Sequence, residues 1–231
     1  MVSVLTSRIR EIRERIAAAA ERARRDPAEV TLMAVTKTHG RDLALRAYEA
    51  GIRVFGENRT AEGAEKFHRV PEDLELHLIG HLQTNKAAAA AEAFSWVDSI
   101  DSFRVAAALD RRLAALGKKA DILLQLNTSG EASKSGYRDF GALLEDLPGI
   151  LALPRLRLRG LFTIGPLHGG AEAARGSFRT LRHRFAELKK LPGCGALDVL
   201  SMGMSSDFEI AVEEGATMVR LGSILFGERL P

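Results

Sequence analysis

The sequence has 231 residues, 46% of them hydrophobic and 27% charged, a globular composition that excludes disordered and collagen-like chains. The 33 Lys and Arg residues against 30 Asp and Glu leave a formal charge of +3, and only 6% are aromatic, so no nucleic-acid surface is indicated. The single Cys194 fits a reducing compartment, the charged N-terminus lacks the apolar core of a secretory signal, and no apolar run is long enough to cross a bilayer. We therefore expect a cytoplasmic protein that binds neither nucleic acid nor membranes.

The N-terminal segment has the spacing of an amphipathic helix. Leu5, Ile9, Ile12 and Ile16 recur every three or four residues, which places them on one helical face. Asp26-Pro27 is expected to end this helix, because proline has no backbone N–H to continue its hydrogen bonding. We therefore predict one helix ahead of the first strand.

Eight short apolar segments rich in β-forming residues follow. They are residues 31–37, 53–58, 75–80, 96–101, 120–127, 158–165, 196–203 and 218–222. The gaps have room for helices, and stretches such as 41–51 and 172–191 are rich in helix-forming Ala, Leu, Arg and Glu. This alternation predicts a parallel α/β sheet closed into a (β/α)8 barrel of TIM type, with the N-terminal helix as an addition. An open doubly wound sheet is the alternative, which eight regular units disfavour. Because no linker interrupts the pattern, residues 1–231 are expected to form one domain.

A (β/α)8 barrel carries its functional residues at the C-terminal ends of the strands, and the end of the first predicted strand is unusual. Lys37 stands there, directly after the segment LMAVT. A buried lysine near another cation loses its proton more easily and becomes a nucleophile towards carbonyl compounds. The alternative is a side chain that extends from the barrel mouth into solvent, and the strand alone does not separate the two.

The loops after the last two predicted strands have the composition of phosphate-binding loops. They read LSMGMSSD and VRLGSILFG, with hydroxyl groups at Ser201 and Ser223 and flexible backbone at Gly203 and Gly222. Each glycine taken alone favours a simple turn. Two such loops together with a strand-end lysine point to a phosphorylated carbonyl compound, and pyridoxal 5′-phosphate (PLP) meets both requirements.

Six stretches of the chain, in the same order, resemble the YggS/PROSC family of pyridoxal phosphate homeostasis proteins. They are AVTKTHG, FGENR, HLIGHLQTNK, LNTSGEASKSG, GLFTIGP and LSMGMSSDFEIAVEEGATMVRLGSILFG, which together extend from residue 34 to residue 227. The resemblance implies a barrel similar to the N-terminal domain of alanine racemase, the fold-type III arrangement of PLP enzymes. The chain departs from the family pattern after FGENR, where TAEGAEKF replaces a continuation that contains Tyr and Gln.

The resemblance also implies which residues contact the cofactor. Lys37 would form the internal aldimine, and Asn58 would lie beside the ring. Ser201, Gly222 and Ser223 would hold the phosphate. No catalytic residue and no metal ligand are assigned.

The same resemblance places Arg220 against the pyridine nitrogen. Because a guanidinium group is effectively always charged, a ring nitrogen that faces it accepts a hydrogen bond and stays unprotonated. An unprotonated pyridine is a weaker sink for electrons. Such a site suits holding PLP, or racemisation, better than transamination.

Three further signals are weaker. His77 and His81 in HLIGH lack the glutamate of a zinc-binding helix, so we predict no metal site there. Lys134 lies in a Gly/Ser-rich loop, for which a mobile lid and an ordinary solvated loop stay equally open. Lys86 either faces the ligand or starts the following helix, and the resemblance favours a place near the site.

Three functions follow from these residues: a PLP carrier or buffer, a PLP-dependent amino-acid racemase, and a lysine aldolase without cofactor. The two phosphate-type loops disfavour the aldolase. Racemases of this fold type add a C-terminal β-domain with a second acid–base group, whereas this sequence stops at Pro231. We therefore expect a non-enzymatic PLP homeostasis protein, monomeric, with apo PLP-dependent enzymes as acceptors. A racemase-like enzyme is the alternative.

Overall fold

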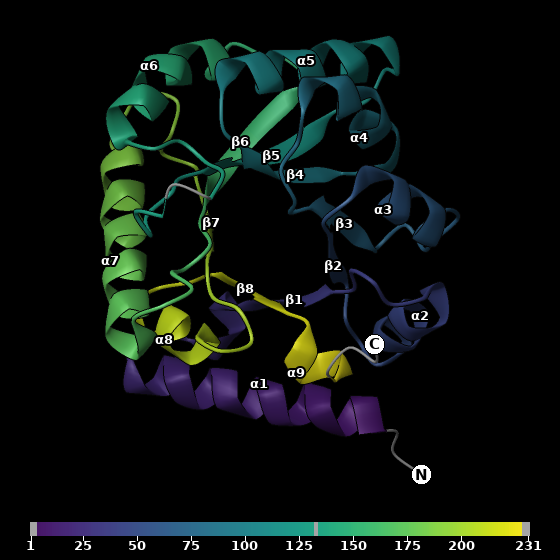
Figure 1. Cartoon of the computed structure of the whole chain (residues 1–231), viewed down its shortest axis with the longest axis vertical. Coiled ribbons are helices and arrows are strands. Elements are labelled where there is room, and N and C mark those ends of the chain that lie inside the picture. Colours follow the sequence, from purple (N-terminus) through teal and green to yellow (C-terminus); the bar gives the residue numbers. More distant parts are fainter. Residues whose placement is uncertain (1–3, 132–133, 228–231) are drawn as a thin grey trace.

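The computed structural model describes residues 4–131 and 134–227, within which eight parallel strands close into a barrel (Figure 1). The strands are β1 (Thr31–Val35), β2 (Val54–Glu57), β3 (Glu75–Leu78), β4 (Trp96–Ile100), β5 (Ala120–Gln125), β6 (Leu156–Phe162), β7 (Val199–Ser201) and β8 (Met218–Leu221). β1 pairs with β2 on one side and with β8 on the other, so the sheet closes on itself. The prediction of a closed barrel with strands in chain order is confirmed.

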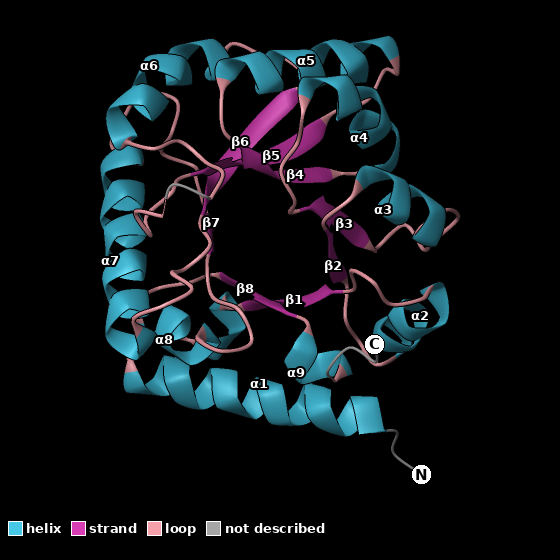
Figure 2. Cartoon of the chain, viewed as in Figure 1, coloured by secondary structure: helices cyan, strands magenta, loops and turns pink. Residues whose placement is uncertain are grey.

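Helices fill the connections and surround the ring of strands (Figure 2). They are α2 (Arg41–Glu49), α3 (Thr60–Lys66), α4 (Ala87–Ala93), α5 (Phe103–Ala115), α6 (Phe140–Leu151), α7 (Gly170–Leu188), α8 (Phe208–Glu213) and α9 (Ser223–Phe226). Two short 3-10 helices, η1 (Pro27–Glu29) and η2 (Thr84–Lys86), precede β1 and α4. In the part of the chain that the structure describes, no helix combines the length and the apolar character needed to cross a membrane.

The predicted N-terminal helix is α1 (Val4–Arg22), which lies along α8 and α9 at the bottom of Figure 1. Ile9, Ile12 and Ile16 are buried, as their spacing predicts. The helix ends at Arg22, ahead of the expected stop at Asp26-Pro27, because the chain turns at Arg24, which has a φ of +56°. The side chain of Arg25 then donates hydrogen bonds to Val212 O (2.7 Å) in α8 and to Ala216 O (2.9 Å). α1 is thereby fixed on the outside of the barrel.

All eight predicted segments run past the C-terminal ends of the observed strands, by one to three residues. β1, for example, ends at Val35 instead of residue 37, and β7 ends at Ser201 instead of residue 203. The residues beyond these ends turn out of the sheet: His39 N–H donates to Thr36 O over 3.0 Å. The last residues of each apolar segment therefore lie beyond the end of the strand and form the mouth of the barrel.

The alternation of side chains along the strands separates two buried cores. Residues such as Phe55 and Leu78 face the surrounding helices. The apolar side chains inside the barrel are Met33, Val35, Val54, Trp96, Leu123, Phe162, Val199 and Met218. Asp98, Ser201 and Arg220 each stand two positions after one of these residues, so they share the inner face. The interior of this barrel is therefore partly polar.

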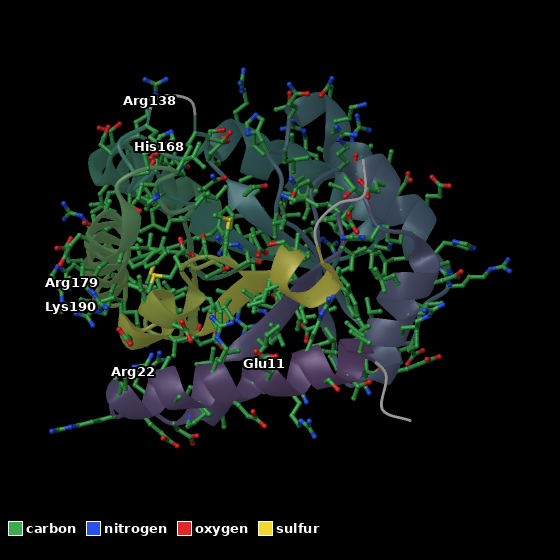
Figure 3. The ribbon with its side chains drawn as sticks, turned by 60° about the horizontal axis from the view of Figure 1, so that its bottom comes forward. Glu11, Arg22, Arg138, His168, Arg179 and Lys190 are labelled. Carbon is green, nitrogen blue, oxygen red and sulfur yellow. The ribbon has the colours of Figure 1, made fainter. Side chains whose placement is uncertain are left out.

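Charged side chains cover the outside of the helices. Figure 3 shows Glu11, Arg22, Arg179 and Lys190 at the surface. Arg22 pairs with Glu213 over 2.8 Å, across the contact between α1 and α8. Exposed pairs of this kind each contribute only about 0–1 kcal/mol, so the fold depends mainly on its two buried cores.

Candidate functional site

A cavity of about 620 Å3 opens at the C-terminal mouth of the barrel. Its walls come from the segments that follow β1, β2, β3, β5, β6, β7 and β8, together with the upper inner face of the barrel. Five of the six residues that sequence analysis singled out line it: Lys37, Asn58, Arg220, Gly222 and Ser223. Residues far apart in the sequence thus meet where a (β/α)8 barrel carries its functional groups.

Lys37 reaches the cavity because of the alternation along β1. Met33 and Val35 point into the barrel, so two residues further on the side chain of Lys37 points inward as well. Thr36, between Val35 and Lys37, is fully buried and faces the other way, towards α3. Lys37 itself is half-buried at the mouth. The sequence left open whether Lys37 faces a site or extends into solvent, and in the structure it is part of the cavity wall.

Arg220 forms part of the cavity floor and is almost completely buried. Its guanidinium group donates to Ser201 Oγ (2.9 Å) and to Thr163 O (2.7 Å), and it stacks 4.3 Å above the centre of the Phe162 ring. Burial lowers the pKa of Arg220 to about 10, and the carboxylates of Asp98 and Asp207 partly oppose this. Arg220 is therefore still a cation at neutral pH.

Ser201 differs from its expected place. It is the last residue of β7, it is fully buried, and it does not line the cavity. Its hydroxyl accepts a hydrogen bond from Arg220, which orients the guanidinium group from below. Because Ser201 is still part of β7, its side chain lies in the barrel interior below the cavity, whereas the cavity wall is built from the loop that follows.

The residues of that loop that do line the cavity are Met204, Ser205 and Ser206. Ser205 Oγ accepts long hydrogen bonds from the backbone N–H groups of Gly222 (3.4 Å) and Ile224 (3.5 Å), which joins this loop to the one after β8. The motif SMGMSSD signals the loop, but with three serines it does not signal which hydroxyl faces the cavity. Ser201, predicted from the sequence, does not line the cavity, whereas Ser205 and Ser206, which were not predicted, do.

The segment after β3 allows close packing beside Asn58. A Cβ atom at Gly80 would lie 2.1 Å from Asn58 O, so only glycine fits. Asn58 is exposed at the rim of the cavity. Neither Asn85 nor Lys86 lines the main cavity; Asn85 lines a neighbouring one that shares His81 with it.

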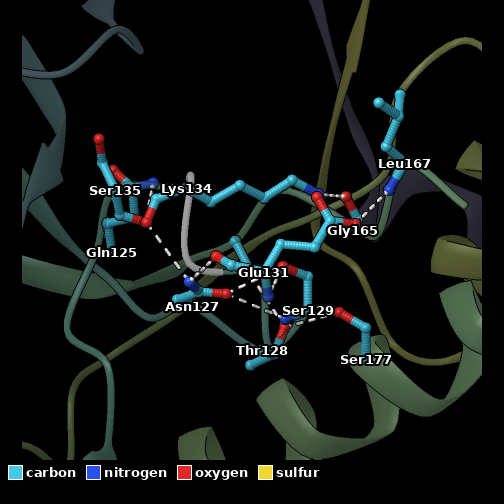
Figure 4. Close-up of polar contacts among 11 residues, drawn as sticks. Gln125, Asn127, Thr128, Ser129, Glu131, Lys134, Ser135, Gly165, Leu167 and Ser177 are labelled. Carbon is cyan, nitrogen blue, oxygen red and sulfur yellow. Dashed lines mark hydrogen bonds and ion pairs between the residues drawn. The ribbon is translucent and has the colours of Figure 1, made fainter.

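The loops after β5 and β6 are tied together at the opposite rim (Figure 4). Lys134 Nζ donates to Gly165 O and pairs with Glu131 at 3.1 Å. Glu131 Oε1 also accepts from the backbone N–H of Leu167 over 2.8 Å. Lys134 is half-buried and lines the cavity, so it is neither solvated nor detached from the barrel.

Below the cavity, His77 and Asp98 form a fully buried pair, with Nδ1 and Oδ1 2.9 Å apart. Trp96 stacks on the imidazole ring at 4.6 Å between ring centres. Burial alone would lower the pKa of His77, but Asp98, assisted by Glu75, outweighs it and the pKa is raised. His81 instead pairs with Asp101 at 3.1 Å, so the two histidines of HLIGH serve different carboxylates.

The cavity therefore combines groups suited to an anionic carbonyl compound. Lys37 supplies an amine, the loops after β7 and β8 supply serine hydroxyls and backbone N–H groups, and Arg220 supplies a fixed cation. Among the described lining residues there is no carboxylate, tyrosine or cysteine. Within residues 4–131 and 134–227, no group of three or more His, Cys, Asp or Glu side chains is arranged to hold a metal ion.

The chain is similar to known proteins over almost its whole length. The sequence pattern described as "Alanine racemase, N-terminal domain" matches residues 8–230. The pyridoxal phosphate homeostasis protein of Pseudomonas aeruginosa is 41% identical over 233 residues, which cover 99% of this chain and 97% of that protein. PipY of Synechococcus elongatus, solved with PLP bound, is 40% identical, with 94% of this chain and 100% of that chain covered and a TM-score of 0.80. An alanine racemase of Clostridium difficile shares the fold alone, at 16% identity, a TM-score of 0.69, and coverage of 94% of this chain and 55% of the racemase.

Proposed function

We propose that this chain, which belongs to the pyridoxal phosphate homeostasis proteins and carries the alanine racemase N-terminal domain, binds PLP in the cavity at the barrel mouth. Within that proposal, residues 1–231 are one PLP-binding domain. The single observation that carries it is the convergence of Lys37, Arg220 and the serine-rich loop after β7 on one cavity.

The donor set of the cavity fits PLP. Ser205, Ser206 and Ser223 line one wall, and the backbone N–H groups of Gly222 and Ile224 converge on the hydroxyl of Ser205. Hydroxyls and backbone N–H groups are the usual ligands of a phosphate. We assign the phosphate to Ser205, Gly222 and Ser223, and assign Ser201 to the support of Arg220.

The remaining wall suits an aromatic ring. Ile79 and Ile164 are apolar lining residues, Asn58 lies at the rim, and Arg220 offers a buried cation for the ring nitrogen. PLP, when bound, supplies an aldehyde with which a lysine amine condenses, with loss of one water. Lys37 is the lysine that we assign to this covalent attachment.

We propose a carrier and not a catalyst. Racemisation needs a second acid–base group opposite the lysine. Besides Lys37 and Arg220, three described side chains of the cavity wall titrate. Lys134 pairs with Glu131, and His81 pairs with Asp101. His39 comes two residues after Lys37 in the same loop and packs its ring against Phe226, 5.1 Å between ring centres. The function proposed is therefore to bind free PLP inside the cell and to supply it to apo-enzymes.

The test is covalent trapping. Purified protein is incubated with PLP, reduced with borohydride, digested and mapped by mass spectrometry. We expect a phosphopyridoxyl group on Lys37 and none in Lys37→Ala. Labelling of Lys86 or Lys134 in place of Lys37 would overturn the assignment, and a protein that binds no PLP would overturn the function.

A further inference from the structure

We propose that Lys66, Glu57 and Glu62 form a positioning unit that fixes the turn carrying Lys37, and so sets the direction of its side chain into the cavity. This inference rests on the proposed covalent role of Lys37. None of the three residues lines the cavity. They act from the outer face of the barrel, where α3 packs against β2 and β3 and Lys66 reaches the residue after β1.

Lys66, the last residue of α3, holds the backbone just before Lys37. It is only 7% exposed, and its Nζ donates to Thr36 O at 2.6 Å. The same Nζ donates to Glu57 Oε1 (2.6 Å) and to Glu62 Oε1 (3.0 Å). An ammonium group has three N–H donors, and here one is directed at the carbonyl next to Lys37.

Glu62 holds the backbone just after Lys37. Its Oε1 accepts a hydrogen bond of 2.6 Å from the N–H of Thr38. Thr38 has a φ of +69°, in the left-handed region that a β-branched residue rarely adopts. The turn has one local hydrogen bond, from His39 N–H to Thr36 O, but the conformation of Thr38 is unfavourable, so the contact from Glu62 is needed to hold it.

Glu57, the last residue of β2, is the third member of the unit. Its Oε1 accepts from Thr36 Oγ1 at 2.6 Å as well as from Lys66. Both neighbours of Lys37 are thus held by side chains on the outer face of the barrel. The side chain of Thr36 is held outward, so the alternation that continues from Val35 leaves Lys37 pointing inward, and Glu62 fixes the backbone that follows it.

The unit is poorly suited to stability alone. Glu57 is fully buried, and its Oε2 has no hydrogen-bond partner among the described residues. Burial raises the pKa of Glu57, against the hydrogen bonds from Lys66 and Thr36. Buried ion pairs with unsatisfied oxygens are weak contributors to stability, and apolar side chains often replace them without loss. A positioning role accounts for charged groups here where a stabilising role does not.

The experiment separates positioning from folding with two ligands. PLP can attach covalently to Lys37, whereas 4′-deoxypyridoxine 5′-phosphate has the same ring and phosphate but no aldehyde. In Lys66→Met we expect the affinity for the deoxy compound to stay within about threefold of wild type. The affinity for PLP and the borohydride-trapped fraction on Lys37 should fall about tenfold or more, because small misplacements of a reacting group are costly.

Glu62 supplies a second pair of variants at a position that is more tolerant, with 25% of its side chain exposed. Glu62→Ala should show the same selective loss, whereas Glu62→Gln keeps an acceptor for the N–H of Thr38 and should recover most of the trapping. Lys118→Met is the matched control, because Lys118 also binds a backbone carbonyl, Glu92 O, but far from Lys37 in the fold. We expect it to change neither ligand.

The two ligands also separate the possible failures. Equal loss of both ligands in Lys66→Met and Glu62→Ala would mean that the unit only stabilises the fold, and would overturn the inference. Unchanged trapping in both variants would overturn it as well. A wild-type protein that binds the deoxy compound but is not trapped by borohydride would remove the covalent role of Lys37. One that binds neither compound would remove the proposed function itself.

Discussion

Arg220 donates a hydrogen bond from Nη1 to the hydroxyl of Ser201, 2.9 Å away, in the interior of the barrel. Arg220 borders the cavity, whereas Ser201 is fully buried beneath it. Arg220 can therefore contact a ligand in the cavity directly, whereas Ser201 can act only through Arg220. Ser201 keeps the guanidinium group in place, and a hydroxyl for the phosphate has to come from the loop further on, where Ser205 lies against Gly222.

Ser205→Ala is predicted to weaken PLP binding more than Ser201→Ala does. Loss of a hydrogen bond to a charged phosphate costs about 1.5–3 kcal/mol, or roughly tenfold to a hundredfold in affinity. Ser201→Ala should instead lower the free energy of unfolding by about 1.5–3 kcal/mol, because the buried cation Arg220 loses one acceptor. Spectral titration with PLP and chemical denaturation of both variants measure the two effects. The reverse order of affinities would return the phosphate to Ser201.

The sequence predicts the barrel and part of the site for a clear physical reason. Lys37 and Arg220 continue the inward-facing positions of β1 and β8, so strand periodicity alone assigns them to the mouth. The choice between Ser201 and Ser205 depends on where β7 ends, which an apolar pattern does not show. The contacts of Lys66 with Thr36 and Glu57 depend on how α3 packs on the barrel. The local sequence TAEGAEKF does not indicate that packing.

His77→Gln is predicted to change the pH dependence of stability. The groups facing His77 are Asp98 at 2.9 Å and Glu75 at 3.8 Å, with Trp96 stacked on the ring and Arg159 beyond it. Burial opposes protonation, but Asp98 and Glu75 outweigh it and raise the pKa of His77 above 6.5. A histidine with a raised pKa in the folded state stabilises fully below its unfolded pKa, and this contribution is lost as the pH rises through the folded pKa.

The unfolding free energy of wild type should therefore exceed that of His77→Gln by most below pH 6.5, and the difference should shrink as the pH rises above that value. Breaking a buried pair costs on the order of 3–5 kcal/mol, so the effect is within reach of denaturant titration. Asp98→Asn should remove the same pH dependence, whereas His81→Gln, at a side chain that is 45% exposed, serves as the control. A difference that grows with pH would contradict the assignment.

Glu131→Gln is predicted to speed the release of PLP. Glu131 joins the loops after β5 and β6 through Leu167 N–H and Lys134, and these two contacts lower its pKa. The stabilising contacts of Glu131 are therefore fully present above the pKa that this carboxyl group has in the unfolded chain. They weaken as the pH falls through its lower pKa in the folded protein. Because partly exposed ion pairs are weak, we expect an acceleration of no more than about fivefold. Transfer of PLP to an excess of apo-enzyme measures the rate, and Glu145→Gln on the exposed side of α6 is the control. Equal rates in wild type and Glu131→Gln would show that this tie does not retain the ligand.

The carrier proposal predicts binding of amino acids without turnover. Among the described residues that line the cavity, the groups able to move a proton at neutral pH are lysines and histidines. Lys134 and His81 are held in ion pairs, and His39 lies in the same loop as Lys37 with its ring against Phe226. No lining tyrosine or carboxylate is present in the described part of the chain to act opposite Lys37. The PLP-loaded protein, incubated with L- and D-amino acids in deuterated water, should incorporate no more deuterium at Cα than one equivalent of free PLP does. It should still deliver PLP to an apo-enzyme. Catalytic incorporation that disappears in Lys37→Ala would show a racemase-like enzyme in place of a carrier, because only a site that protonates Cα repeatedly exchanges more than one equivalent.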